Sequence, residues 1–161
     1  MKNKTSIKLP LTEAEKASLR KHKIKLANIL DFGVDELEVL LNAPTERAKE
    51  IHALAAFQTV PSIGIKFAED LVFMGYHSLD ELKGKDGAAL TDEFEHKKGY
   101  WIDPCVEDQF RLVVHFANTN DATKMWWDFT QARKNYRTAY GYPASRPPLA
   151  WHETVGYQRQ E

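Results

Sequence analysis

The most constraining feature of this sequence is a short break between two helical patterns, at residues 58–64. On both sides of the break, apolar residues recur with the spacing of one helix face. Pro61 cannot continue the first helix, and Gly64 can adopt backbone angles that are closed to other residues. The pattern therefore predicts a helix over residues 45–58, a tight turn, and a second helix over residues 64–74.

The start of the second helix is a candidate anion-binding site. The first amides of a helix have no partner within it, and the positive end of the helix dipole favours negative charge. We expect the contacts to come from Ser62, Ile63, Gly64, Ile65 and Lys66, the last of which adds a full positive charge. The alternative is a turn that only packs two helices together, since helix pairs joined by Pro/Gly turns are common.

The turn resembles the hairpin of the helix-hairpin-helix family, whose members bind the DNA backbone. That hairpin typically reads Pro-Gly-Ile-Gly, followed by a basic and a small residue. Here the sequence is Pro61-Ser62-Ile63-Gly64, followed by Lys66 and Ala68, so Ser62 replaces the first glycine. The resemblance implies contacts with phosphates, which position a protein on DNA without reading its base sequence. It also implies that the backbone carbonyls of Gln58, Val60 and Ile63 are candidates to hold a monovalent cation.

Further motifs follow the hairpin in a distinctive order. They are Asp103-Pro104-Cys105-Val106, Phe110-Arg111, Trp127-Asp128-Phe129, Arg146-Pro147 and Ala150-Trp151-His152-Glu153. With the hairpin, they resemble the bacterial pathogenicity-locus family, small helix-hairpin-helix proteins sometimes labelled mitomycin resistance proteins. The resemblance covers roughly residues 24–153. It implies little chemistry, because the activity of that family is not well defined.

The rest of the chain predicts an all-α fold, a compact multi-helix domain built around the hairpin. Capping boxes and an Asp-Pro start signal mark helix beginnings, and no segment alternates apolar and polar residues as a strand would. We expect a flexible basic N-terminus over residues 1–10 and a helical domain over residues 11–120. Residues 121–161 should add a short helix and an aromatic, proline-rich strap packed on the same domain.

The charge distribution is uneven although the net charge is −1. Residues 1–26 contain eight Lys/Arg and two Asp/Glu. Residues 27–126 contain nine Lys/Arg and 18 Asp/Glu. A basic N-terminal arm could follow a phosphate backbone, and a solvated terminus is the alternative. Cys105 is the single cysteine, and no apolar run reaches membrane-spanning length. Both features suit a cytoplasmic protein that does not enter a membrane.

The sequence contains no recognisable catalytic arrangement. Its six histidines lie far apart, and Cys105 lacks a neighbouring histidine to serve as its base. Zinc through Cys105 is disfavoured because structural zinc sites usually show paired ligands. We therefore expect no cofactor apart from the cation at the hairpin, and a non-enzymatic protein is favoured over a small-molecule resistance enzyme.

The C-terminal segment offers a rival site. Tryptophan, tyrosine and arginine are concentrated there, and aromatic residues beside arginine can stack on bases or form a patch for a protein partner. The same residues also pack cores. We therefore expect DNA binding without base specificity, to a duplex backbone and with help from a protein partner or a second copy. The alternative is a protein-interaction adaptor that uses the aromatic segment.

Overall fold

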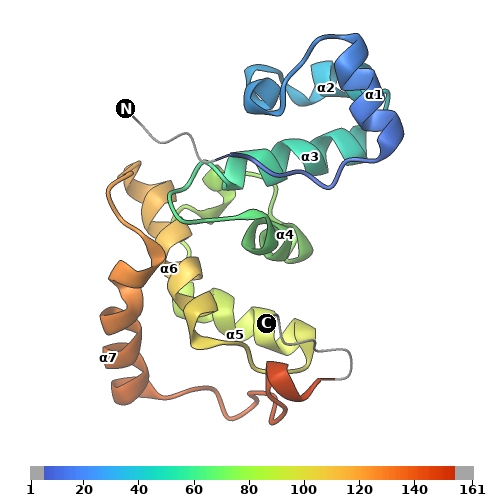
Figure 1. Ribbon diagram of the computed structural model, residues 1–161. Coiled ribbons are helices and arrows are strands. Elements are labelled where there is room, and N and C mark those ends of the chain that lie inside the picture. The colour runs from blue at the N-terminus through green and yellow to red at the C-terminus, as the bar shows by residue number, and fades with distance from the viewer. Residues whose placement is uncertain (1–5, 155–161) are drawn as a thin grey trace. The chain divides into compact units, whose positions relative to one another are not determined.

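The computed structural model describes residues 6–154, which form helices, turns and extended segments but no strand (Figure 1). The all-α expectation is confirmed. The backbone divides into two compact units, one up to Leu82 and one from Lys83 onward. The limits expected from the sequence, at residues 10 and 120, stay a prediction.

The N-terminal unit contains both helices that flank the 58–64 turn. Its elements are α1 (Glu13–Lys21), η1 (Leu26–Asp31), α2 (Val34–Leu41), α3 (Thr45–Phe57), α4 (Ile65–Phe73) and η2 (Leu79–Leu82), where η marks a 3-10 helix. Thr12 begins α1 with a capping box, because its hydroxyl accepts from the Glu15 amide while the Glu15 carboxylate accepts from the Thr12 amide. The predicted helix limits on both sides of the turn agree with α3 and α4 to within about two residues.

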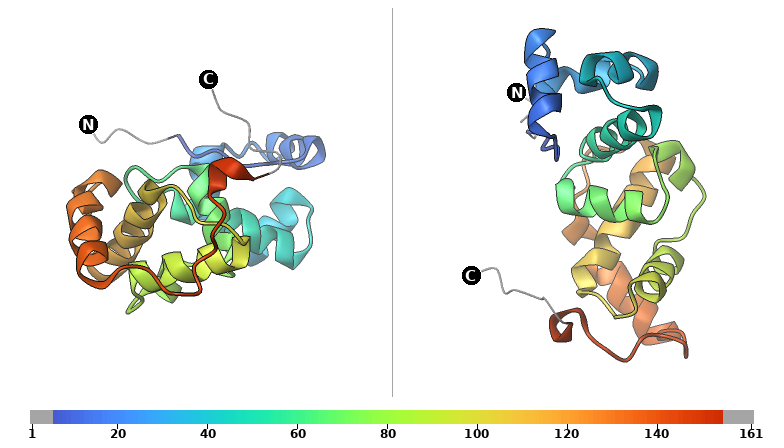
Figure 2. Two further views of the ribbon diagram at one scale, coloured as in Figure 1. Left: turned by 90° about the horizontal axis from the view of Figure 1, so that it is seen from below. Right: turned by 90° about the vertical axis from the view of Figure 1, so that its right-hand side faces the viewer.

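The centre of this unit is α3, which lies between α2 and α4 (Figures 1 and 2). Ile51, Leu54 and Phe57 of α3 are fully buried, as are Leu37 of α2 and Leu71 of α4. Burial of a large apolar side chain is worth about 1.5–3 kcal/mol. Packing of α3 against its neighbours therefore fixes where the following turn is placed.

The C-terminal unit consists of α5 (Gly87–Lys98), α6 (Pro104–Thr119), η3 (Trp126–Phe129), α7 (Thr130–Tyr140) and η4 (Trp151–Glu153). The Asp103 carboxylate caps α6 by accepting from the Cys105 amide at 2.9 Å, as the Asp-Pro signal predicts. Asn120 ends the helix in the left-handed conformation. Phe94 of α5 and Phe110 of α6 meet edge to face, with ring centroids 5.6 Å apart.

The extended segment after α7 returns to this unit. Trp101 and Ala150 form an isolated bridge, and the Trp101 amide donates to the Leu149 carbonyl at 2.8 Å. Arg146 in the same segment pairs with the buried Glu95 of α5 at 2.9 Å. These contacts hold part of the proline-rich segment against α5 and the residues that follow it. Within residues 6–154, no helix has the length and apolar character needed to cross a membrane.

Candidate functional site

The backbone of the 58–64 turn is a tight reversal anchored in the core. Val60 and Ile63 are buried, and the Ile63 amide donates to the Val60 carbonyl at 3.2 Å. Between them lie Pro61 and Ser62, and Ser62 has a φ of 64°. Proline at the second position and positive φ at the third are typical of a type II turn, whose third position favours glycine. The structure thus gives the reason for a glycine where this chain has Ser62.

The five residues expected to contact an anion differ in what they can offer. The Ile63 amide is already bonded to the Val60 carbonyl within the turn and its side chain is buried, so an anion contact by this residue stays a prediction. Ser62 has an interaction within the protein as well. By contrast, the amides of Gly64, Ile65 and Lys66 have no hydrogen-bond partner among residues 6–154. These three donors stand at the first turn of α4, at the positive end of its dipole.

Gly64 carries the first of these three amides, and the fold itself does not require a glycine there. Its φ of −102° and ψ of −174° are ordinary extended values, and a Cβ added to it would meet no heavy atom within 4 Å. Gly87 is a useful contrast, since a Cβ there would lie 2.9 Å from the Cα of Arg111. The packing of α5 against α6 therefore excludes any side chain at position 87. The missing side chain at Gly64 leaves open space at the start of α4.

Lys66 supplies a positive charge beside these amides. It is exposed on the second residue of α4 and forms no ion pair within the part of the chain that the structure describes. Lys49 of α3 is similarly exposed and unpaired, nine residues before the start of the turn. The two lysines differ chiefly in their distance from the unpaired amides.

A second lysine is fixed near the turn by the buried side chain of Gln58. The Gln58 carboxamide accepts from the Lys8 amide at 3.0 Å and donates to the Lys8 carbonyl at 2.7 Å. Arg47 donates to the Pro10 carbonyl at 2.7 Å, so residues 8–10 run along α3 (Figure 1). Gln58 caps the C-terminus of α3, where the turn begins. The backbone of exposed Lys8 is therefore held against the first residue of the turn, a feature that sequence patterns did not reveal.

The predicted cation site comprises the carbonyls of Gln58, Val60 and Ile63. The Val60 carbonyl already accepts the Ile63 amide, and a carbonyl oxygen has a second lone pair for another partner. This cation site stays a prediction. Elsewhere among the described residues, no group of three or more His, Cys, Asp or Glu side chains could hold a metal ion.

Cys105 is not an activated nucleophile in this structure. Burial and the neighbouring Asp103 carboxylate raise the pKa of its thiol to about 11, against an ordinary value of 9.0. The helix N-terminus was the feature that could have lowered this pKa, and burial outweighs it. At neutral pH the side chain is a thiol, which is the less reactive form.

The aromatic C-terminal segment is largely engaged with its own arginines. Arg146 lies 3.6 Å from the Tyr142 ring centroid and 5.1 Å from that of Trp101. The Arg137 guanidinium also lies over the Tyr142 ring, 4.2 Å from its centroid. These rings are consequently poor candidates for stacking on bases, since their faces already carry guanidinium groups. Trp127 and Tyr140 remain open, with 55% and 76% of their surfaces exposed.

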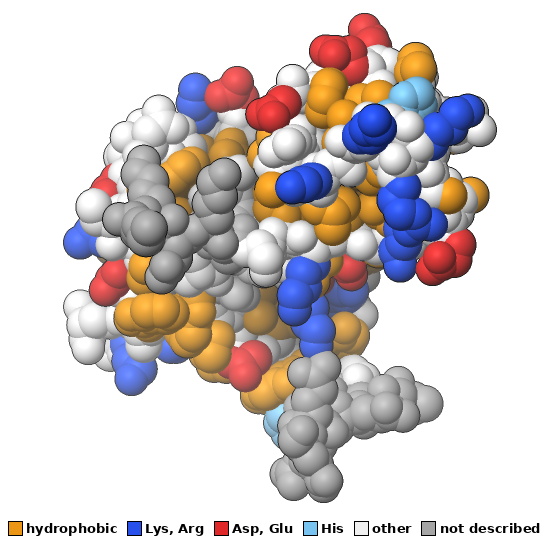
Figure 3. Space-filling model, turned by 45° about the horizontal axis from the view of Figure 1, so that its top comes forward, with side chains coloured by type: hydrophobic (Ala, Val, Ile, Leu, Met, Phe, Trp, Pro, Cys, Tyr) orange, Lys and Arg blue, Asp and Glu red, His pale blue; other side chains and the backbone are white. Residues whose placement is uncertain are grey.

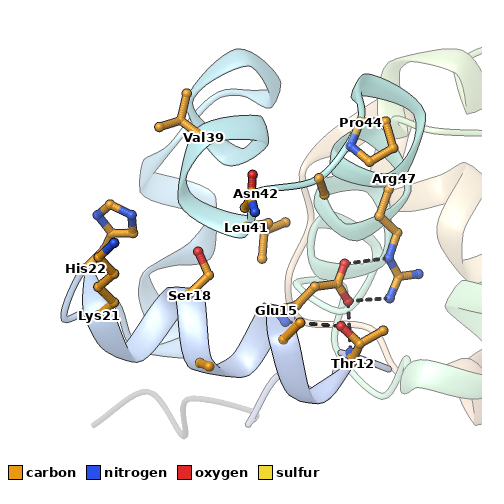
Figure 4. A pocket seen from close by; sticks show the side chains of 13 residues that line it. Thr12, Glu15, Ser18, Lys21, His22, Val39, Leu41, Asn42, Pro44 and Arg47 are labelled. Carbon is orange, nitrogen blue, oxygen red and sulfur yellow. Dashed lines mark hydrogen bonds and ion pairs between the residues drawn. The ribbon is translucent and has the colours of Figure 1, made fainter.

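A hollow of about 960 Å³ lies between α1, α2 and the start of α3 (Figure 4). At one end the Glu15 carboxylate accepts two hydrogen bonds from Arg47, both at 2.9 Å. The guanidinium lowers the pKa of Glu15 from 4.5 to about 2. Val39, Asn42 and Lys21 line the open side (Figure 4). Glu15 and Arg47 are paired with each other, so the hollow offers no free carboxylate.

Comparison with known protein families identifies the family of this chain. A family model described as "Cdd1: Pathogenicity locus" matches residues 50–135, which is 86 of the 161 residues. The chain belongs to this pathogenicity-locus family, as its motifs predicted, whereas the helix-hairpin-helix and mitomycin resistance labels stay predictions. The match includes the end of α3, the 58–64 turn and α4. We found no curated protein and no solved structure that matches the chain.

Proposed function

We propose that this protein binds the phosphate backbone of DNA, with α3, the 58–64 turn and α4 acting as a helix-hairpin-helix. The observation that carries the proposal is the set of unpartnered amides at Gly64, Ile65 and Lys66. A Cβ at Gly64 would meet no heavy atom within 4 Å, and a helix N-terminus with unpartnered donors and room beside it suits a phosphate oxygen. No base-reading group is implied, so binding should not depend on sequence.

Binding should be weak and sensitive to salt. A hairpin that neutralises about two phosphates loses roughly tenfold in affinity between 50 and 200 mM salt. Affinities for such non-specific contacts are on the order of 10⁻⁴ to 10⁻⁶ M. A protein partner or a second copy would then be needed for tight association in a cell, and the proposed location is the cytoplasm.

The direct test replaces Gly64 with alanine. Gly64→Ala adds a methyl group next to the unpaired amides while leaving the backbone in an allowed conformation, so we expect at least about tenfold weaker binding to a labelled duplex at low salt. Gly33→Ala is the matched control, because Gly33 is an exposed N-cap glycine at the start of α2. Equal binding by the two variants would contradict the proposal.

A charge reversal gives an independent arm of this test. Lys66→Glu should abolish binding, and it should not harm the fold, because an acid near a helix N-terminus interacts favourably with the dipole. Lys49→Glu makes the same charge change on α3 and should retain most of the affinity. Two duplexes of unrelated sequence should bind equally well. Base-dependent binding, or equal losses for both lysine variants, would argue against contacts made by the turn.

A second candidate function is a protein-interaction adaptor, and the observation that favours it is the exposure of Trp127 and Tyr140. For the adaptor function, residues 141–154 form a strap held by Arg146, and the exposed rings of Trp127 and Tyr140 bind the partner protein. Replacement of Trp127 and Tyr140 by alanine would then remove association with that partner, whereas Gly64→Ala would not. Loss of DNA binding in the Gly64 variant, with none in the aromatic variant, would favour the first function.

A further inference from the structure

A small apolar groove with a cationic border lies on the N-terminal unit, away from the residues assigned to phosphate. Its volume is about 210 Å³, and it is lined by Leu9, Leu11, Lys16, Leu19, Arg20, Ile24 and Leu26. Figure 3 shows Lys and Arg side chains beside hydrophobic ones on one face of the molecule. Small-molecule sites are typically larger, roughly 300–1,000 Å³.

The C-terminal end of α1 forms this groove. The Ile24 amide donates to the Leu19 carbonyl at 2.9 Å, and the Lys23 amide donates to the Arg20 carbonyl at 3.0 Å. With Lys23 in the left-handed conformation, this is the Schellman pattern, which brings a hydrophobic residue back onto the last turn of a helix. Ile24 thus lies beside Leu19, which is buried at the floor, while Leu26 is 37% exposed at the rim.

The charges around the groove are strongly biased. Six Lys/Arg are found between residues 6 and 26, at positions 8, 16, 20, 21, 23 and 25. The two acids in this range are already occupied, since Glu13 pairs with Lys16 at 3.3 Å and buried Glu15 pairs with Arg47. Arg20 has no ion-pair partner among the described residues. The border can therefore complement an acidic ligand.

We propose that this groove docks an acidic, amphipathic segment of another protein. One bulky apolar side chain of that segment would enter between Ile24 and Leu26, and a neighbouring carboxylate would meet Arg20. The groove is concave, which suits a protruding side chain better than the flat surface of a membrane. It also contains no aromatic ring on which a base could stack, which disfavours a nucleic acid.

The test uses a short, fluorescently labelled helical peptide with Leu at i, i+4 and i+7 and Glu elsewhere, titrated with the full-length protein. We expect saturable binding, and at least about tenfold weaker binding after Leu26→Glu or Arg20→Glu. Arg20 is exposed, so its variant should fold even if the Leu26 variant does not. Val39→Glu is the control, because Val39 is 69% exposed on α2 and does not line this groove.

Several outcomes would overturn the proposal. The peptide in which Lys replaces Glu should not bind, and equal binding of both peptides would show that charge plays no part. Sedimentation of the protein with phosphatidylserine vesicles, without peptide binding, would assign the surface to a membrane. A concentration-dependent mass by light scattering that Leu26→Glu removes would identify a second copy as the occupant. Gly64→Ala should leave peptide binding unchanged, so this test and that of DNA binding can fail independently.

Discussion

The 58–64 turn and the region around Arg146 use the same kinds of group in opposite ways. At the turn, three amides and Lys66 have no partner within residues 6–154. In the C-terminal unit, Arg133, Arg137 and Arg146 all pair with carboxylates at 2.6–2.9 Å. No buried side-chain nitrogen or oxygen atom of the described residues lacks a hydrogen-bond partner.

This difference shows why residue type alone is a poor guide to a binding site. The sequence places arginine and aromatic residues together in the C-terminal segment, a composition typical of nucleic-acid binding. The structure shows that buried carboxylates already neutralise those arginines, so they mainly stabilise the fold. The less conspicuous lysines of the N-terminal unit keep their charges available. Each prediction below tests one side of this comparison.

The largest effect should come from Arg146→Ala. Glu95 is 1% exposed and accepts from Arg146 and from the Ile102 amide, so the substitution leaves a buried carboxylate short of a partner. We expect a loss of about 3–5 kcal/mol in the free energy of unfolding, measured by urea denaturation. The double variant Glu95→Leu, Arg146→Met should recover most of this loss. A loss below about 1 kcal/mol for Arg146→Ala would show that the ion pair is not structural.

The N-terminal unit offers a smaller version of the same test at Glu15. Because Arg47 holds the pKa of Glu15 at about 2, against 4.5 ordinarily, the ionised carboxylate stabilises the folded state above about pH 4.5. That contribution should be lost as the pH falls from 4.5 toward 2. Glu15→Gln should cost about 2 kcal/mol at pH 7, and the gap from the unmodified protein should narrow in acid. Glu13→Gln is the exposed control, and a gap independent of pH would contradict the assignment.

Ser62→Gly should have a moderate effect of opposite sign. A side chain in the left-handed region costs roughly 1–2 kcal/mol, part of which is offset by the greater freedom of glycine in the unfolded chain. We expect a gain of about 0.5–1 kcal/mol in thermal or urea unfolding. Asn42→Gly is the comparison, since Asn42 has a φ of 51° but asparagine tolerates this region better. Destabilisation by Ser62→Gly would mean that the contacts of Ser62 outweigh the strain.

The smallest effect should come from Lys8→Ala. If Lys8 adds one phosphate contact beside the turn, its removal should lower the slope of log K against log salt by about 0.9 and weaken DNA binding several-fold at low salt. Lys49→Ala should leave the slope unchanged. An unchanged slope for Lys8→Ala, with Gly64→Ala still defective, would confine the contacts to the turn.

Local sequence signals determined most of the helices. Thr12 with Glu15 and Asp103 with Pro104 began helices as predicted, because capping depends on residues only a few positions apart. Pro61 and Gly64 likewise marked the turn between α3 and α4. The motifs were also sufficient to identify the pathogenicity-locus family. In all these cases the interacting groups are neighbours along the chain.

Only the tertiary structure decided which polar groups are free. Gln58 binds the backbone of Lys8, 50 residues away, and Arg146 binds Glu95 across 51 residues. A propensity or a motif does not encode such pairings, because they depend on how packed helices bring distant segments together. The sequence thus set the helices and the turn, whereas packing paired the arginines of the C-terminal unit with carboxylates and left the amides of Gly64, Ile65 and Lys66 without a partner among residues 6–154.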